Sequence, residues 1–208
     1  MMFFSFEFVN MKYRFFYLLI SFFFMGCAQI PSQKSQQNNS WDMQQQSLVA
    51  LSDWSLTAKL AVITPKERNS VNMFWQQSQQ GFHINLTTFL GLTVLDVKKE
   101  GGKTTIIDNN GKSYSSRNTE ALIEELSGIV LPIEQLQQWI KGNPEDAHYK
   151  LDENYQVIHL VSSDEEDDKW SINYSGYHTT NNINLPHRLQ LKRKDLRLKI
   201  ARSNWNVK

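Results

Sequence analysis

The chain has 208 residues, a formal net charge of +1 and 12% aromatic residues. That length is enough for one domain with a substantial core. Because proteins that bind nucleic acid usually carry a basic excess, the nearly neutral balance argues against a nucleic-acid partner.

Residues 1–26 predict an export signal. Lys12 and Arg14 precede an apolar run over residues 15–24, interrupted only by Ser21. A transmembrane helix needs roughly 20 apolar residues, so this run is too short to span a bilayer and is typical of a signal peptide that is removed. The segment before Met11 adds nothing that such a signal needs, so translation could start at Met1 or at Met11.

The only cysteine in the chain, Cys27, follows Gly26 at the end of this run. An exported protein with a single cysteine cannot use it for an intramolecular disulfide. The pattern resembles a lipobox, in which signal peptidase II cuts before a cysteine that carries diacylglycerol. It implies a covalent lipid on Cys27 and, because Ala28 replaces the aspartate of inner-membrane lipoproteins, an outer-membrane location. The alternative is an ordinary signal or membrane anchor with an incidental cysteine.

The next segments predict a tether and a domain. Residues 27–41 are rich in Gln, Asn and Ser and have little to bury, which indicates a flexible tether. The domain then occupies residues 42–208. Residues 42–52 predict a short amphipathic helix, with Asp42 as its N-terminal cap.

From residue 54 the apolar residues alternate, which is the period of a β-strand. Trp54, Leu56, Ala58, Leu60 and Val62 share one face of the first strand. The same pattern predicts further strands at residues 71–77, 82–86, 93–97, 103–108, 155–162, 169–175, 188–193 and 196–202.

Two helices interrupt the strands. Thr119 can cap the first, and Gly128 suits its end. The second has Pro132 in its first turn, where the missing N–H costs nothing, and ends at Gly142. Strands joined by short connections predict an antiparallel meander. The expected fold is therefore a mainly β (α+β) curved antiparallel sheet, an unclosed β-barrel whose open interior the helices plug.

No catalytic or metal-binding constellation emerges. The five histidines, at positions 83, 148, 159, 178 and 187, have no metal-ligand spacing, and Cys27 is committed to the anchor. The acidic run over residues 164–168 lacks the pattern of a calcium loop and predicts a solvated hairpin between two strands. The sequence predicts neither an enzyme nor a bound cofactor beyond the lipid.

The segment Thr87–Thr93 carries apolar residues where turns usually carry polar ones. In one interpretation Phe89 and Leu90 fold under the sheet as part of the core. In the other they project as an apolar knob that contacts lipid, since burying such a side chain is worth roughly 1.5–3 kcal/mol.

Several segments together resemble the LolB family of outer-membrane lipoprotein receptors. They are Phe74–Gln77, Phe89–Gly91, Asp108–Tyr114, Leu131–Gly142, Tyr149–Asp152, Trp170–Tyr177 and Leu198–Trp205. The resemblance implies that a hydrophobic cavity receives acyl chains of lipoproteins from the periplasmic carrier LolA. It also implies that Leu90, with Phe89, helps to pass this cargo into the inner leaflet of the outer membrane.

Transfer then runs down an affinity gradient without nucleotide, and we expect a monomer. We predict that the cavity is lined by Leu60, Val62, Met73, Trp75, Ile84 and Leu86, and closed by Leu136, Trp139 and Ile140. The alternative from another class is a lipid-anchored structural or assembly factor with a solid core.

Overall fold

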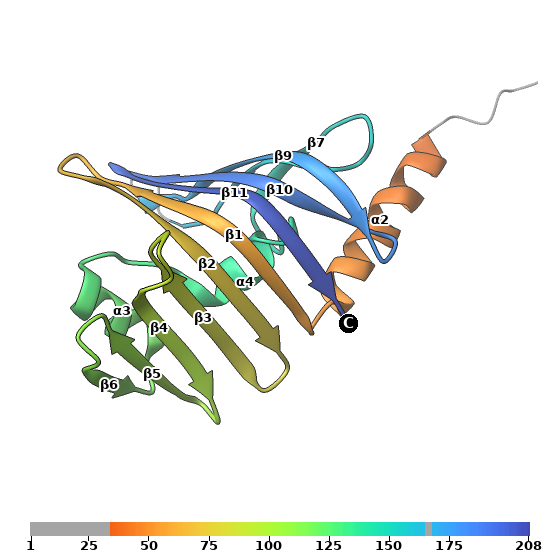
Figure 1. Cartoon of the computed structure of the whole chain (residues 1–208). Coiled ribbons are helices and arrows are strands. Elements are labelled where there is room, and N and C mark those ends of the chain that lie inside the picture. The colour runs from red at the N-terminus through yellow and green to blue at the C-terminus, as the bar shows by residue number, and fades with distance from the viewer. Residues whose placement is uncertain (1–33, 165–167) are drawn as a thin grey trace, which may run out of the picture. The chain divides into compact units, whose positions relative to one another are not determined.

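The structure is a computed structural model that describes residues 34–164 and 168–208. The predicted signal, Cys27 and the first part of the tether lie outside the described residues. Gln36–Lys208 form one compact unit built around a single antiparallel sheet. The strand order is β6-β5-β4-β3-β2-β1-β11-β10-β9-β8-β7, a meander in which β1 and the last strand, β11, pair at the centre (Figure 1).

The strands have these bounds: β1 Trp54–Ile63, β2 Arg68–Ser78, β3 Gly81–Thr87, β4 Thr93–Glu100, β5 Lys103–Asp108, β6 Ser113–Ser116, β7 His148–Leu151, β8 Val157–Val161, β9 Ser171–Thr180, β10 Ile183–Arg193 and β11 Leu196–Val207. The sheet is strongly curved, and its two edge strands, β6 and β7, do not pair with each other. The predicted fold class, a curved and unclosed antiparallel sheet with helices, is confirmed.

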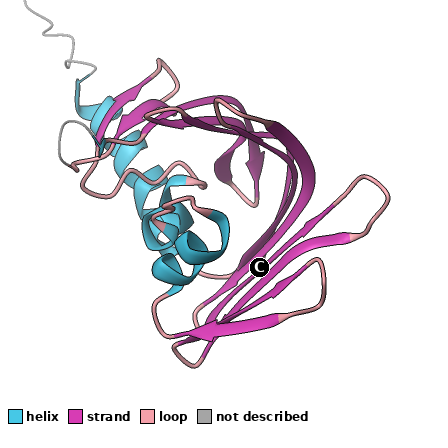
Figure 2. Cartoon of the chain, turned by 90° about the vertical axis from the view of Figure 1, so that its left-hand side faces the viewer, coloured by secondary structure: helices cyan, strands magenta, loops and turns pink. Residues whose placement is uncertain are grey.

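Three helices are described: α2 Lys34–Ala50, α3 Thr119–Ser127 and α4 Ile133–Trp139. Figure 2 shows them on the concave side of the sheet. Among the described residues no helix is both long and apolar enough to cross a membrane.

The helix boundaries differ in detail from the prediction. Helix α2 begins at Lys34, inside the segment predicted as tether, and Asp42 lies within it rather than capping it. Glutamine and lysine are good helix formers, so the polar composition that suggested a tether also permits a helix. Helix α3 is capped by Asn118, whose side chain accepts from the Ala121 N–H, so the prediction of Thr119 as the cap is wrong by one residue. The predicted end is confirmed, because Gly128 follows the helix in the left-handed conformation.

Strands β6 and β7 were not predicted. Both contain four residues and little apolar alternation, so they form by adding to the edges of an existing sheet. The predicted strands are all present, although β2, β3, β4, β9, β10 and β11 extend beyond the expected ranges.

Candidate functional site

The concave face of the sheet is continuously apolar because the strand register aligns the inward residues. Trp75 pairs with Leu56 on one side and with Ile84 on the other, and Ile84 pairs with Val97. Residues paired across an antiparallel ladder share a face, so these side chains form a row across neighbouring strands. A parallel row contains Ala58, Met73, Leu86 and Leu95.

Helix α4 crosses this face and is tied at both ends. Near its start the Lys99 ammonium, from β4, lies 3.3 Å from the Glu134 carboxylate. At its end the Tyr174 hydroxyl, from β9, donates to the Trp139 carbonyl oxygen at 2.9 Å. The helix therefore bridges two strands that are well separated in the sheet.

The nine predicted lining residues belong to a single hydrophobic cluster. Six are buried: Met73, Trp75, Ile84, Leu136, Trp139 and Ile140. Three are half-buried and pack against them: Leu60, Val62 and Leu86. The six strand residues among them share one face of the sheet, and inward residues of its other half, such as Ile172, Leu189 and Leu198, were not among the predicted lining. Their alternation in β9, β10 and β11 was the available signal. Whether the cluster receives a ligand is a separate question.

Four half-buried apolar residues lie at one end of the concave face, next to the β1–β2 turn and the β3–β4 loop. We call this end, lined by Leu60, Val62, Leu86 and Leu95, the mouth. Further along the same strands, Trp54 and Leu56 on β1 and Phe82 and Ile84 on β3 are buried. Along β1 and β3 the apolar side chains are therefore more accessible at the mouth than away from it.

The loop between β3 and β4 stands beside the mouth, one residue beyond Leu86 in the chain. Phe89 is 84% exposed and Leu90 72% exposed. Leu92 is exposed as well. Of the two interpretations of this segment, the one that buries Phe89 and Leu90 in the core is therefore wrong.

The backbone of this loop is well ordered by hydrogen bonds. The Thr88 N–H donates to the Leu92 carbonyl oxygen at 2.8 Å, and the Gly91 N–H donates to the Thr88 carbonyl oxygen at 3.1 Å. Asn72 on β2 donates to the same Thr88 oxygen at 2.9 Å. Gly91 has φ +85°, which favours glycine. These bonds hold the base of the loop at Thr88, Gly91 and Leu92, while the tip exposes the apolar side chains of Phe89 and Leu90.

Two polar groups inside the apolar cluster have no protein partner. The indole N–H groups of Trp75 and Trp139 are buried, and neither donates a hydrogen bond to any described residue. Buried donors are usually paired, so these two are exceptions.

Lys141, just after α4, is a buried cation that the sequence analysis did not single out. It is 2% exposed, and its ammonium donates to the carbonyl oxygens of Leu48 at 2.6 Å and Leu51 at 2.9 Å. Burial lowers the pKa of this amine to about 8. The contact joins α4 to the end of α2, and only its place in the Leu131–Gly142 segment marked it in the sequence.

No metal site is formed by the residues that the structure describes. The rings of His178 and His187, on the paired strands β9 and β10, lie with centroids 3.9 Å apart, but among the described residues no third ligand joins them. In the acidic run, Asp168 pairs with Arg193 and Lys194, and hydrogen bonds from these two cations lower its pKa.

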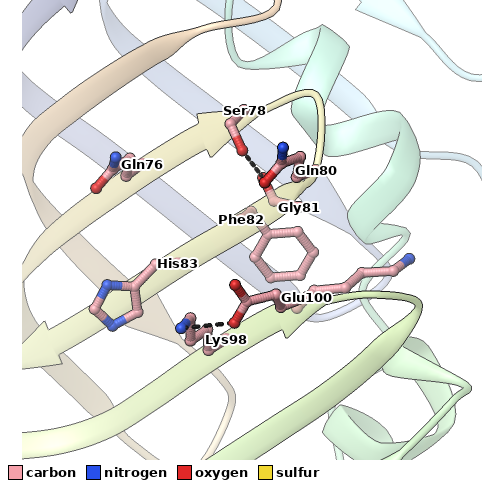
Figure 3. Close-up of a pocket in the computed structure, with 9 residues that line it drawn as sticks. Gln76, Ser78, Gln80, Gly81, Phe82, His83, Lys98 and Glu100 are labelled. Carbon is pink, nitrogen blue, oxygen red and sulfur yellow. Dashed lines mark hydrogen bonds and ion pairs between the residues drawn. The ribbon is translucent and has the colours of Figure 1, made fainter.

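A shallow pocket near the β2–β3 turn is a weaker candidate for a site (Figure 3). Most of its lining is polar and already paired internally: Ser78 donates to the Gly81 carbonyl oxygen, and Lys98 lies 2.8 Å from Glu100. The concave face and its adjacent loop are the more distinctive features.

Comparison with known proteins supports this choice. Residues 52–205 match the family described as outer membrane lipoprotein LolB. An outer-membrane lipoprotein LolB of Psychromonas ingrahamii is 50% identical over 190 residues, covering 91% of this chain and 92% of the relative. The LolB of Aeromonas hydrophila is 33% identical over 182 residues, covering 88% and 90%.

Solved structures agree on the fold. A LolA-superfamily protein from Nitrosomonas europaea superposes with a TM-score of 0.52 over 83% of this chain and 93% of its own, at 7% sequence identity. That identity is low enough for the likeness to concern the fold alone. With the family match over most of the domain and relatives alike over nearly their full length, the chain belongs to the LolB family of outer-membrane lipoproteins.

Proposed function

We propose that this protein accepts the acyl chains of lipoproteins in its concave face and delivers them to the outer membrane. The observation that carries the proposal is the mouth, where half-buried apolar side chains at the edge of the apolar interior lie beside an exposed apolar loop. An acyl chain gains about 0.8 kcal/mol for each buried methylene, so it can cross water only inside such an interior.

The two unpartnered indole N–H groups support the same assignment. A lipoprotein acyl chain ends in an ester or amide oxygen, which accepts a hydrogen bond. Trp75 and Trp139 supply donors within the cluster that covers the concave face. Pairing with cargo would satisfy them.

The donor in this proposal is the periplasmic carrier LolA, and the steps are driven by increasing affinity. A tenfold gain in affinity takes about 1.4 kcal/mol, which a few additional apolar contacts supply. The protein works as a monomer, held near the membrane through the lipid on Cys27, and needs no nucleotide.

The first test is transfer of a radiolabelled lipoprotein from purified LolA to residues 28–208, without nucleotide. These residues contain the whole compact unit. We expect transfer to go nearly to completion. Absence of transfer to a folded domain from an active donor would favour the alternative, a lipid-anchored structural factor.

A charge placed on the concave face should abolish acceptance. Leu86→Glu buries a carboxylate among apolar side chains at the mouth, whereas Ile158→Glu makes the same type of change at a residue that is 41% exposed. We expect loss of acyl-probe binding for Leu86→Glu and for Trp139→Ala but not for the Ile158→Glu control. Unchanged binding in both concave-face variants would refute the lining assignment.

A further inference from the structure

The four central strands of the sheet have an unusual charge composition. Strands β2, β1, β11 and β10 are neighbours, and they contain no aspartate or glutamate. Strands β1 and β2 each contain one Lys or Arg, and strands β10 and β11 each contain three. The whole chain, by contrast, is almost balanced, with 22 basic and 21 acidic residues.

Most of these cations lie on the outer face, opposite the apolar interior. Lys59 pairs with Ala201, which pairs in turn with Arg188, so the two cations share one row. Arg68 and Arg197 both pair with Ile63 in another row. We call the outward cations the basic face: Lys59, Arg68, Arg188, Lys192, Arg197, Lys199 and Arg202.

The basic face lacks internal compensation. Within the part of the chain that the structure describes, none of its seven cations forms a salt bridge, and all but the half-buried Lys199 are exposed. At the neighbouring hairpin, in contrast, Arg193 and Lys194 both pair with Asp168. Unpaired cations of one sign on one face create a positive potential that attracts anions.

The basic face is continuous with the apolar loop. A groove on the outer face is lined by Lys59, Asn72, Phe74, Thr87 and Arg202, among others. Asn72 in this groove donates to the Thr88 carbonyl oxygen at the base of the loop. The basic face and the exposed apolar side chains of the loop are therefore adjacent.

From this juxtaposition we propose that the basic face binds the anionic headgroups of the membrane into which the loop inserts. The inference rests on the membrane contact in the proposed function and adds its lipid specificity. An apolar knob supplies only a reversible contact, and cations at the level of the headgroups strengthen it for anionic lipids. The occupant is an anionic phospholipid surface.

The test is cosedimentation of residues 28–208 with vesicles of phosphatidylcholine, with and without phosphatidylglycerol. We expect binding to increase with phosphatidylglycerol and to weaken with salt. The triple variant Lys59→Gln, Arg197→Gln, Lys199→Gln should lose at least tenfold in partitioning to anionic vesicles. A control that removes the same charges elsewhere, Lys103→Gln, Arg117→Gln, Lys150→Gln, should bind as the unmodified protein does.

Equal losses in the two triple variants, or equal binding to both kinds of vesicle, would overturn the proposal. The proposal would also be overturned if the basic-face variant bound vesicles normally but failed to accept cargo. That result would indicate that the partner of the basic face is an acidic protein. Acceptance of acyl probes is measured in parallel and should be unchanged in both variants. Failure of the unmodified protein to accept acyl probes would contradict the proposed function, whatever the result with vesicles.

Discussion

Lys141 stabilises the end of helix α2 while itself being buried. The last carbonyl oxygens of a helix lack helical N–H partners, and this ammonium donates to Leu48 within the last turn and to Leu51 just beyond it. A neutral amine still has two N–H groups, which is the number of carbonyls it contacts. The hydrogen bonds therefore survive deprotonation, whereas the cost of burying the charge disappears.

This predicts a pH dependence of stability. Burial lowers the pKa of Lys141 from 10.5 to about 8, so between these pH values the unfolded chain binds a proton that the folded chain does not. The free energy of unfolding contributed by Lys141 should rise with pH across this window. We expect the stability difference between the protein and Lys141→Met, measured by urea denaturation, to increase from pH 7.5 to pH 9.5 by on the order of 1–3 kcal/mol.

A difference that shrinks with pH would mean that the positive charge itself, acting on the helix end, is what stabilises α2. Burial raises the pKa of Tyr174 and Tyr177, but both proteins contain these two hydroxyls, so their contribution to the pH dependence cancels in the difference.

Leu90, unlike Lys141, is exposed and contributes little to the core, so its replacement should affect function rather than stability. Leu90→Glu should leave both stability and cargo acceptance intact and should slow release of prebound cargo into vesicles. Val49→Glu, a comparably exposed position on α2, is the matched control and should release cargo normally. Failure of acceptance with normal release would contradict the role assigned to the loop.

At the scale of elements, the turn that ends the α4 segment depends on Gly142. Its φ is +84°, and a Cβ there would lie 3.0 Å from the Tyr177 hydroxyl oxygen, which donates to the Val157 carbonyl oxygen. An alanine would therefore suffer both backbone strain and a close contact with an already engaged side chain.

The substitution Gly111→Ala is a control that introduces the backbone strain without the close contact. Gly111 has φ +78° with open space around its Cα, so Gly111→Ala should cost about 1 kcal/mol from backbone strain alone. We expect Gly142→Ala to lower the free energy of unfolding by about 1 kcal/mol more than this, because of Tyr177. Equal losses in urea denaturation would show that Tyr177 moves aside without penalty.

The elements that could be predicted from the sequence are those whose side chains alternate against the interior. In β1, for example, Trp54, Leu56 and Ala58 are all buried, as their spacing indicated. Strand β7 was missed because His148, Tyr149 and Lys150 are all exposed, and it forms only by pairing with β8. Its place depends on the sheet being present already, which local periodicity does not record.

The same distinction applies to the candidate site. The predicted lining residues lie in one cluster because alternation determines which face of a strand each side chain occupies, and their role in binding acyl chains stays a prediction. The burial of Lys141 was not predicted, since its partners are backbone carbonyls roughly ninety residues away in the chain. The basic face escaped notice for a related reason: its cations come from four strands that are neighbours only after β11 pairs with β1.

For the molecule as a whole, the strand order predicts a gradient of stability. The central strands β1 and β11 each have two partners and buried inward residues, whereas β6 and β7 are short and lie at the edges. Hydrogen exchange followed by mass spectrometry should show the edge strands exchanging first and β1 and β11 last. Bound acyl probe should slow exchange most in α4, which crosses the concave face; an effect confined to β6 and β7 would contradict this arrangement.

The two unpaired edges of the sheet also affect how large a guest the interior can hold. When a sheet closes on itself, strand number and stagger fix its radius, and a larger guest requires breaking of interstrand hydrogen bonds. Here β6 and β7 are not bonded to each other, so the radius of curvature can change while every ladder is kept. In the proposed function, the interior would widen by flattening of the sheet to fit the guest, and the ties of α4 to β4 and β9 would limit this widening.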